Sequence, residues 1–220
     1  MFIPALIFMI LTYASELVCA FLELEKPRKI IKPFCLVALI LFLITLKLDS
    51  IYVYGALFFG LLGDIFLIYK KQHKMMILLG IFSFFIGHLF YIFTFVDLLS
   101  YEIPKIAIVL IVAVGLLSPL LPYKICYSKT KSFTVPGAIY MYTLVLELVC
   151  AILVAIDQKS GYSNLLLIGN VLFLISDIIL SISMFFKDFK RRDFYIMGTY
   201  FASQTLMSLC LLFMMRYENI

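Results

Sequence analysis

Charged side chains are scarce in this sequence, because Asp, Glu, Lys and Arg together make up only 14% of its 220 residues. Soluble domains usually contain about 25% of such residues. At the same time, 65% of the residues are apolar and the mean hydropathy is +1.12. This balance excludes a water-soluble fold and leaves no separate soluble domain, so it predicts a polytopic membrane protein.

Cysteine and histidine patterns are also missing. The five cysteines occur singly, with no CxxC pair and no nearby histidine cluster, so neither a disulfide framework nor a zinc site built on cysteine is expected. The basic residues form no continuous stripe, so the net charge of +5 indicates anionic membrane lipids as counterions and no nucleic-acid partner. The first residues lack the features of a removable signal peptide, and we expect them to form the first permanent span.

Long apolar runs, broken at charged and turn residues, predict an all-α fold with a single transmembrane domain over residues 1–220. A bilayer crossing takes roughly 20 apolar helical residues, so about eight spans fit the chain. The fifth span is short and contains Pro119. The expected spans are 2–22, 33–48, 51–69, 75–96, 105–121, 135–156, 164–186 and 194–215.

Basic residues alternate between the expected loops in a way that predicts an orientation. Fourteen of the 18 lysines and arginines fall in the first, third, fifth and seventh loops. By the positive-inside rule these loops are cytoplasmic, so both termini face outward. We expect a multi-pass protein of a bacterial inner (plasma) membrane or of an organelle membrane. The residues concerned are Lys26, Arg28, Lys29, Lys32, Lys70, Lys71, Lys74, Lys124, Lys129, Lys131, Lys187, Lys190, Arg191 and Arg192.

Two short sequences repeat along the chain. GDIFL at 63–67 recurs as SDIIL at 176–180, and Pro33 at the start of the second span matches Pro136 near the start of the sixth. These correspondences predict two halves of four helices each, related by an axis along the membrane normal. A second echo, ELVCA at 16–20 and 147–151, joins spans of opposite direction and is treated as chance.

Five ionisable side chains lie inside the expected spans, where a charge is costly and therefore marks a candidate functional site. They are Glu16, Asp64, His88, Glu147 and Asp177. Small residues at helical spacing share the face of Asp64, so another helix can approach it closely. Three further spans each have one polar face, formed by Asn170, Asp177 and Ser181, by Gly80, Phe84, His88 and Tyr91, and by Tyr200, Gln204 and Ser208.

The depth of these residues follows from the helical rise. At 1.5 Å per residue, Asp64 lies roughly 9 Å from Lys70 and Asp177 roughly 15 Å from Lys187, so both carboxylates fall in the cytoplasmic half. His88 lies deeper, roughly 21 Å from the basic end of its own span. The spacing predicts a pocket that opens toward the cytoplasm, with both aspartates on its wall and His88 near its floor.

These residues also have other interpretations. A buried aspartate can form a structural hydrogen bond between helices, His88 can be a packing residue, and Glu16 and Glu147 can be structural or share a proton. Two aspartates and one histidine could bind a divalent ion, although no second histidine or cysteine stands at ligand spacing, and a chelator test decides this point. A proton-coupled transporter of small molecules or lipids, or a non-catalytic lipid-binding subunit, would also use buried acids.

The order and spacing of the motifs resemble the YhhN-like lysoplasmalogenases, which are small eight-span membrane hydrolases. The resemblance covers most of the chain. Where alanine is expected before the histidine and before the glutamine, this chain has Gly87 and Ser203. The matching motifs are Lys32-Pro33, Gly63-Asp64, Gly87-His88-Leu89-Phe90-Tyr91, Tyr140, the block from Gly169-Asn170 to Ser176-Asp177, and Tyr200 with Ser203-Gln204.

The resemblance implies hydrolysis of the vinyl ether bond of a choline or ethanolamine lysoplasmalogen, without a cofactor, to a fatty aldehyde and a glycerophospho-alcohol. By this hypothesis one of Asp64 and Asp177 protonates the vinyl ether, while the other stabilises the cation and orients water. The sequence does not assign which is which. Lys32, at the cytoplasmic mouth, is expected to bind the lipid phosphate, although topology alone also predicts a basic residue there. The side chains expected to hold the substrate and the carboxylates are His88, Tyr91, Tyr140, Asn170, Tyr200 and Gln204.

Overall fold

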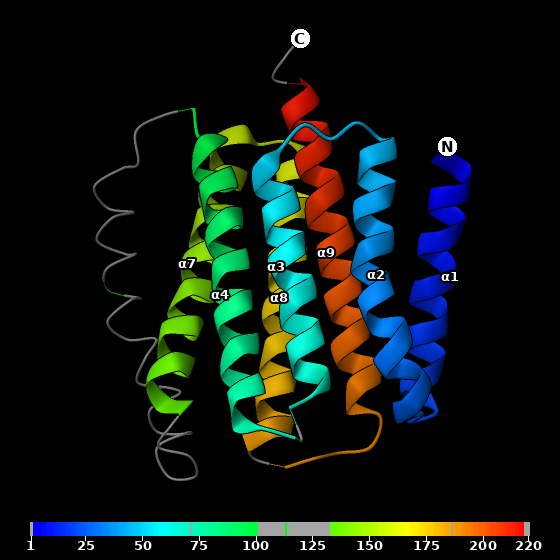
Figure 1. Cartoon of the computed structure of the whole chain (residues 1–220). Coiled ribbons are helices and arrows are strands. Elements are labelled where there is room, and N and C mark those ends of the chain that lie inside the picture. Colours follow the sequence, from blue (N-terminus) through cyan, green and yellow to red (C-terminus); the bar gives the residue numbers. More distant parts are fainter. Residues whose placement is uncertain (1, 71, 101–112, 114–132, 186, 218–220) are drawn as a thin grey trace.

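The apolar runs of the sequence form a bundle of long helices. A computed structural model describes residues 2–70, 72–100, 113, 133–185 and 187–217, and within these residues the chain forms seven helices and no strands. The helices lie side by side, and the start of α1 and the end of α9 lie at the same end of the bundle (Figure 1). In chain order they are α1 (Phe2–Phe21), α2 (Glu25–Thr45), α3 (Ile51–Ile68), α4 (Lys74–Asp97), α7 (Thr134–Gln158), α8 (Gly161–Phe185) and α9 (Arg192–Tyr217).

Six of these helices, all except α2, are long and apolar enough to cross a bilayer. They confirm the predicted all-α membrane architecture. The expected span at 105–121 lies outside the described residues, so the count of eight spans and the repeat of four helices stay predictions. α4 and α7 run in the same direction, and α4 ends at the end of the bundle opposite to the start of α7 (Figure 1).

The start of the second helix differs from the sequence prediction. α2 begins at Glu25 rather than at residue 33, and Pro33 lies inside it. The helix therefore extends eight residues beyond the start of the expected span, and the start of the span itself stays a prediction. Pro33 is compatible with a helix because a proline removes one backbone hydrogen bond but keeps φ near the helical value. As a consequence, Arg28, Lys29 and Lys32 stand on a helix and not in a loop. Their charges also explain why α2 is not among the six strongly apolar helices.

Tight turns reverse the chain between neighbouring helices. A non-glycine residue in the left-handed conformation follows three of the helices: Glu23 after α1, Lys47 after α2 and Lys159 after α7, with φ values of 57°, 55° and 49°. One residue in this conformation is a common way to end a helix. The side chain of Ser50 then starts α3 by accepting a hydrogen bond of 3.4 Å from the backbone N–H of Val53.

Two pairs of helices pack most extensively, α3 against α4 and α8 against α9. Small residues permit this packing. A Cβ atom on Gly63 would lie 2.7 Å from the ring of Phe84, and one on Gly169 would lie 2.7 Å from the side chain of Met207. A Cβ atom on Gly87 would lie 3.1 Å from a backbone oxygen of α3. The glycine beside Asp64 therefore lies at the α3–α4 interface, as the small-residue face of this span predicts.

α9 lies inside the bundle and α1 lies at its edge. In the most apolar stretch of each helix, 61% of the residues of α9 are buried, compared with 17% in α1. α9 packs against α8, α1 and α2. The polar face of α9, with Tyr200, is consequently turned toward the other helices rather than toward lipid.

Candidate active site

A cavity opens at the end of the bundle where α2 and α9 begin and α3 ends. It has a volume of about 130 Å³ and also contacts α4 and α8. Asp64 from α3 and Asp177 from α8 both line it, and their exposed fractions are only 2% and 8%. Two carboxyl groups that lie far apart in the sequence are thus placed in one buried pocket.

Asp64 forms an ion pair with a lysine of the neighbouring helix. Nζ of Lys32 lies 2.9 Å from Oδ1 of Asp64, and both side chains are almost fully buried. Lys32 lies within α2, which begins at Glu25, and it is one of the buried residues of this helix. An adjacent ammonium group favours the ionised form of a carboxyl group.

Two polar atoms on the cavity wall lack a partner. Oδ2 of Asp64 and the hydroxyl of Tyr200 have no hydrogen bond to any described residue. Tyr200 is close enough to Asp64 for the two groups to interact electrostatically. Buried polar atoms are normally hydrogen-bonded, so these two are candidates to contact a bound substrate.

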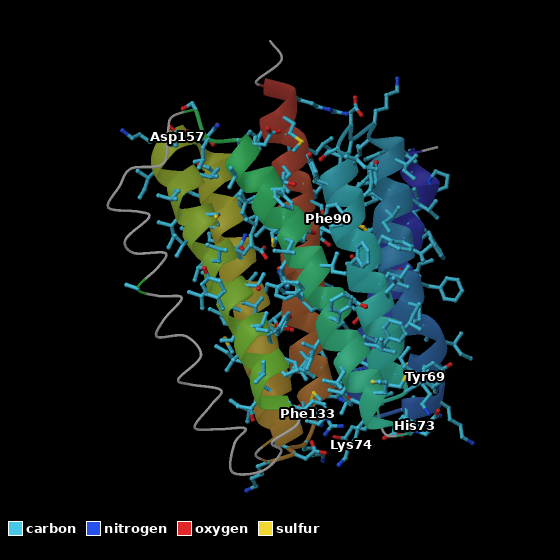
Figure 2. The ribbon with its side chains drawn as sticks, turned by 60° about the vertical axis from the view of Figure 1, so that its left-hand side comes forward. Tyr69, His73, Lys74, Phe90, Phe133 and Asp157 are labelled. Atoms are coloured by element: carbon cyan, nitrogen blue, oxygen red, sulfur yellow. The ribbon has the colours of Figure 1, made fainter. Side chains whose placement is uncertain are left out.

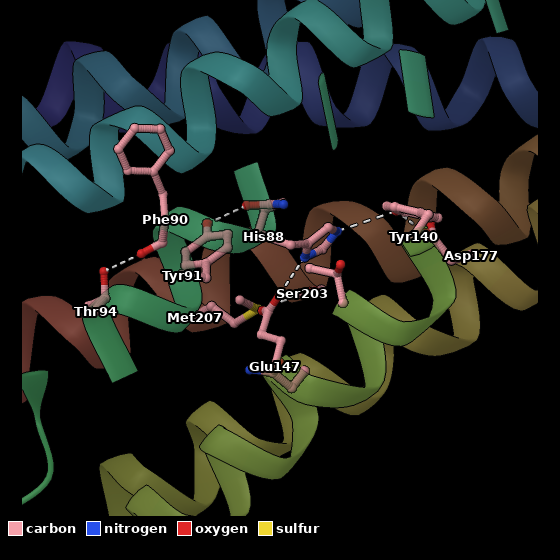
Figure 3. A network of polar contacts seen from close by, with 12 residues as sticks. His88, Phe90, Tyr91, Thr94, Tyr140, Glu147, Asp177, Ser203 and Met207 are labelled. Carbon is pink, nitrogen blue, oxygen red and sulfur yellow. Dashed lines mark hydrogen bonds and ion pairs between the residues drawn. The ribbon is translucent and has the colours of Figure 1, made fainter. Parts of the chain in front are cut away.

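Asp177 begins a chain of polar contacts that leads away from the cavity (Figure 3). The hydroxyl of Tyr140 donates a short hydrogen bond to Oδ2 of Asp177, and Nε2 of His88 lies 3.3 Å from the same hydroxyl. Nδ1 of His88 pairs with Oε2 of Glu147. Because the hydroxyl of Tyr140 donates to Asp177, it can accept a hydrogen bond from Nε2 of His88 in the tautomer that carries a proton on this nitrogen. Asp177 is therefore linked to two further titratable side chains.

His88 also packs against an aromatic side chain. Its ring meets the ring of Phe173 edge-on, with a distance of 4.6 Å between the centroids. Glu147 was one of the five ionisable residues that the sequence marked inside the expected spans, but no catalytic or substrate-binding role was assigned to it. Its pairing with His88 could not be predicted, because the two residues lie on different helices.

Other residues expected to bind substrate lie outside the cavity lining. The hydroxyl of Tyr91 donates a hydrogen bond of 2.6 Å to Oε1 of Gln204, and both side chains are buried between α4 and α9. Nδ2 of Asn170 donates to the carbonyl of Leu166 in its own helix, at 3.4 Å. Among the predicted catalytic and substrate-binding residues, those on the cavity wall are Lys32, Asp64, Asp177 and Tyr200.

Arg28 is the centre of a second charged cluster that the sequence did not predict. Nε of Arg28 lies 3.0 Å from Oε1 of Glu16, and its Nη1 pairs with Asp193. Arg192 pairs with Asp188, and its Nε lies 3.4 Å from Oδ1 of Asp193. These ion pairs join α1, α2 and α9 beside the mouth of the cavity.

The cavity wall is rich in cations. Three of them, Arg28, Arg192 and Lys32, are each paired with a carboxylate. Among the described residues, Lys29 and Lys70 form no ion pair. Burial and the nearby charge of Lys32 lower the pKa of Lys70 to about 8. The five cations are Arg28, Lys29, Lys32, Lys70 and Arg192.

A bound metal ion would need several ligand side chains to converge on one point. In the part of the chain that the structure describes, no three His, Cys, Asp or Glu side chains converge in a group that could hold a metal ion. A chelator test stays the measurement that decides this alternative.

The two ends of the bundle carry different polar residues (Figure 2). Tyr69, His73 and Lys74 lie at the end where the cavity opens, and Asp157 lies at the opposite end. Asp157 there accepts hydrogen bonds of 2.8 Å from the backbone and the side chain of Ser100. The charged cavity residues thus belong to one end only of the described helices.

Comparison with known proteins places the chain in a family. No curated protein and no solved structure matches it. The sequence model of the YhhN family matches residues 28–211, a range that includes Lys32, Asp64 and Asp177. Because this match covers most of the chain, the chain belongs to the YhhN family.

Proposed function

We propose that this protein is a membrane hydrolase that cleaves the vinyl ether bond of lysoplasmalogens, releasing a fatty aldehyde and a glycerophospho-alcohol. One observation carries the proposal: two buried carboxyl groups, Asp64 and Asp177, line the same cavity but have different partners. Membership of the YhhN family is consistent with this activity.

Such a pair suits the chemistry of a vinyl ether. Cleavage begins when an acid protonates the β-carbon, which turns the α-carbon and the ether oxygen into an oxocarbenium ion. A second, negatively charged group then stabilises the cation. Carboxyl groups in distinct environments divide these two tasks in glycosidases, whose transition state has the same character.

Asp64 is the stabilising carboxylate in this proposal, and Asp177 is the acid. The ammonium of Lys32, at 2.9 Å, favours a negative charge on Asp64. Asp177 has no cation within ion-pair distance among the described residues, and it is hydrogen-bonded to Tyr140. Tyr140 connects it to His88, so a protonated Asp177 lies in a network of groups that exchange protons.

The reaction then balances with one molecule of water. Asp177 transfers its proton to the β-carbon, and the electron pair of the double bond forms the new C–H bond. Water adds to the α-carbon and returns a proton to Asp177, giving a hemiacetal. The hemiacetal breaks its bond to the glycerol oxygen, which takes the hydroxyl proton, and the aldehyde leaves.

Aldehyde release by purified protein in detergent tests the proposal. We expect Asp64→Asn and Asp177→Asn each to lower the rate by at least roughly 100-fold, since loss of an acid or of an electrostatic stabiliser has effects of this size. Asp97→Asn is the matched control, because Asp97 is an exposed residue that does not line the cavity.

Thermal unfolding of each variant separates lost chemistry from lost folding. If both asparagine variants unfold like the wild type and keep full activity, the assignment of Asp64 and Asp177 is wrong. If wild-type protein releases no aldehyde from either choline or ethanolamine lysoplasmalogen, the proposed reaction is wrong.

A proton-coupled transporter is the second candidate function. The observation that favours it is the buried chain from Asp177 through Tyr140 and His88 to Glu147, which could pass protons between helices. This alternative predicts pH-driven uptake into proteoliposomes without substrate turnover. The aldehyde assay therefore distinguishes it from the hydrolase.

The proposed orientation places the cavity mouth in the cytoplasm. Lys29 and Lys70 at the mouth belong to the basic end of the bundle, which the positive-inside rule assigns to the cytoplasmic side. A lysophospholipid of the inner leaflet could then bring its headgroup to the charged wall and its chain into the apolar interior. With eight spans, both termini would face the opposite side.

A further inference from the structure

Lys32 is committed to Asp64 and is poorly placed to bind a lipid phosphate as well. Its Nζ lies 2.9 Å from Oδ1 of Asp64, and its side chain is only 11% exposed. The arginines of the wall are likewise held, Arg28 by two carboxylates and Arg192 by Asp188. A phosphate that enters the cavity would compete with a carboxylate for each of these three cations.

Two cations of the cavity wall form no ion pair with any described residue. Lys70 follows α3 and is half-buried, and Lys29 lies on α2, one turn before Lys32. Neither forms an ion pair with any described residue, although carboxylates are numerous at this end of the bundle. An unpaired ammonium group in the wall of a cavity is a site for an anion.

The position of Lys70 fits the length of the substrate. Lys70 comes six residues after Asp64, which corresponds to roughly 9 Å along a helix. In a lysoplasmalogen six bonds separate the α-carbon of the vinyl ether from the phosphorus atom, or roughly 7–8 Å in extended form with bonds of ~1.5 Å. A lipid with its ether at Asp64 would therefore bring its phosphate near Lys70.

We infer that Lys70, assisted by Lys29, binds the phosphate of the lysophospholipid headgroup, and that Lys32 serves Asp64 instead. The inference rests on the proposed hydrolase function and names the part of the site that selects a phospholipid over a neutral glyceryl ether. It also replaces the earlier expectation that Lys32 binds the phosphate.

The charge of Lys70 gives this subsite a pH dependence. Burial lowers the pKa of Lys70 to about 8, and the cations Lys32, Arg28 and Arg192 add to the effect while Asp193 opposes it. The ammonium form that binds phosphate is therefore lost as the pH rises through about 8 in the free protein. KM for the phospholipid should rise in this range, and KM for a substrate without phosphate should not.

Kinetics with Lys70→Met test the subsite. We expect kcat/KM for choline lysoplasmalogen to fall about tenfold, mainly through KM, as one charge-assisted contact would produce. Lys70→Arg should restore most of the loss. Lys74→Met is the control, since Lys74 is an exposed lysine at the same end that does not line the cavity. An unchanged KM in Lys70→Met overturns the inference.

Two further ligands identify what the subsite recognises. Wild-type protein should turn over 1-alkenylglycerol, which lacks the phosphate, about as poorly as Lys70→Met turns over the phospholipid; equal efficiency on both substrates overturns the inference. Glycerophosphocholine should compete with the substrate better than inorganic phosphate does. If inorganic phosphate competes equally well, the subsite binds free anions and the assignment to a lipid headgroup is wrong.

Binding of a saturated 1-alkyl lysophosphocholine separates this inference from the proposed function. This lipid has no vinyl ether, so its affinity does not depend on catalysis. A Kd about tenfold weaker in Lys70→Met, with no change in Lys74→Met, supports the phosphate subsite even if no aldehyde is formed. Equal affinities in all three proteins contradict the subsite even if the hydrolase activity is present.

Discussion

The ammonium of Lys32 lies 2.9 Å from Asp64 in a buried site, where it favours a negative charge on this carboxyl group. In Lys32→Met this cation is lost, and Asp64 takes up a proton rather than remain an unpaired buried charge. We expect aldehyde release to fall roughly 100-fold, the typical effect of removing one preorganised electrostatic group. The measurement is kcat in detergent, and full activity of Lys32→Met would contradict the role given to Asp64.

The hydroxyl of Tyr140 joins Asp177 to His88. Tyr140→Phe removes both contacts while leaving the ring in place, so we expect kcat to fall by at least tenfold and its pH profile to shift, because Asp177 loses its hydrogen-bond donor. Tyr13→Phe is a matched control, since the hydroxyl of Tyr13 bonds to Thr205 outside the cavity. Equal activities of the two variants would show that the contacts from Asp177 through Tyr140 to His88 have a structural role only.

Some residues of this site could be predicted from the sequence and others could not. Asp64 and Asp177 are visible because each interrupts an apolar run, and a charge in that setting needs an explanation. Their partners are not visible in the same way. Lys32 has the same appearance as any lysine near a membrane surface, and the cluster of Arg28 with Asp193 joins residues from the two ends of the chain.

At the scale of the helices, Gly63 controls how closely α3 and α4 approach. In Gly63→Ala the new methyl group would lie 2.7 Å from the Phe84 ring, which must move, and Phe84 also lines the cavity. We expect the melting temperature to drop by about 3–10 °C, as overpacking of a core produces, and activity to fall as well.

Gly137→Ala provides the matched control for this change. A Cβ atom at Gly137 meets nothing within 4 Å, and alanine is the better helix former. Its melting temperature should equal or slightly exceed that of the wild type. If both alanine variants unfold at the same temperature, close packing at Gly63 does not limit the stability of the bundle.

Helix boundaries follow from the sequence to different degrees. The long apolar runs predict the bounds of six helices closely, because the bilayer fixes both the length and the composition of a spanning helix. These helices are α1, α3, α4, α7, α8 and α9. α2 is the exception, since its first turns are charged and contain Pro33. Only packing against neighbouring helices, which is not encoded locally, makes those turns helical and brings Lys32 to Asp64.

At the scale of the whole molecule, the basic end of the bundle decides its orientation. The start of α1 and the end of α9 lie at the same end of the bundle, opposite to the end where α2 and α9 begin (Figure 1). Lys29, Lys70 and Arg192 line the cavity at that opposite end. In a bacterial host we therefore expect a C-terminal alkaline phosphatase fusion to be active and a C-terminal green fluorescent protein fusion to be dark. A bright fluorescent fusion with inactive phosphatase would reverse the orientation and place the cavity mouth outside.

Hydrolysis of a lysoplasmalogen in D₂O tests the central claim most directly. If an acid of the protein protonates the β-carbon before water adds, the released fatty aldehyde carries one deuterium on the carbon next to its carbonyl group. We expect this singly labelled aldehyde from wild-type protein, detected by mass spectrometry after immediate reduction to the alcohol. No aldehyde, or an aldehyde without deuterium, would contradict the account of Asp64 and Asp177 as a pair that cleaves vinyl ethers.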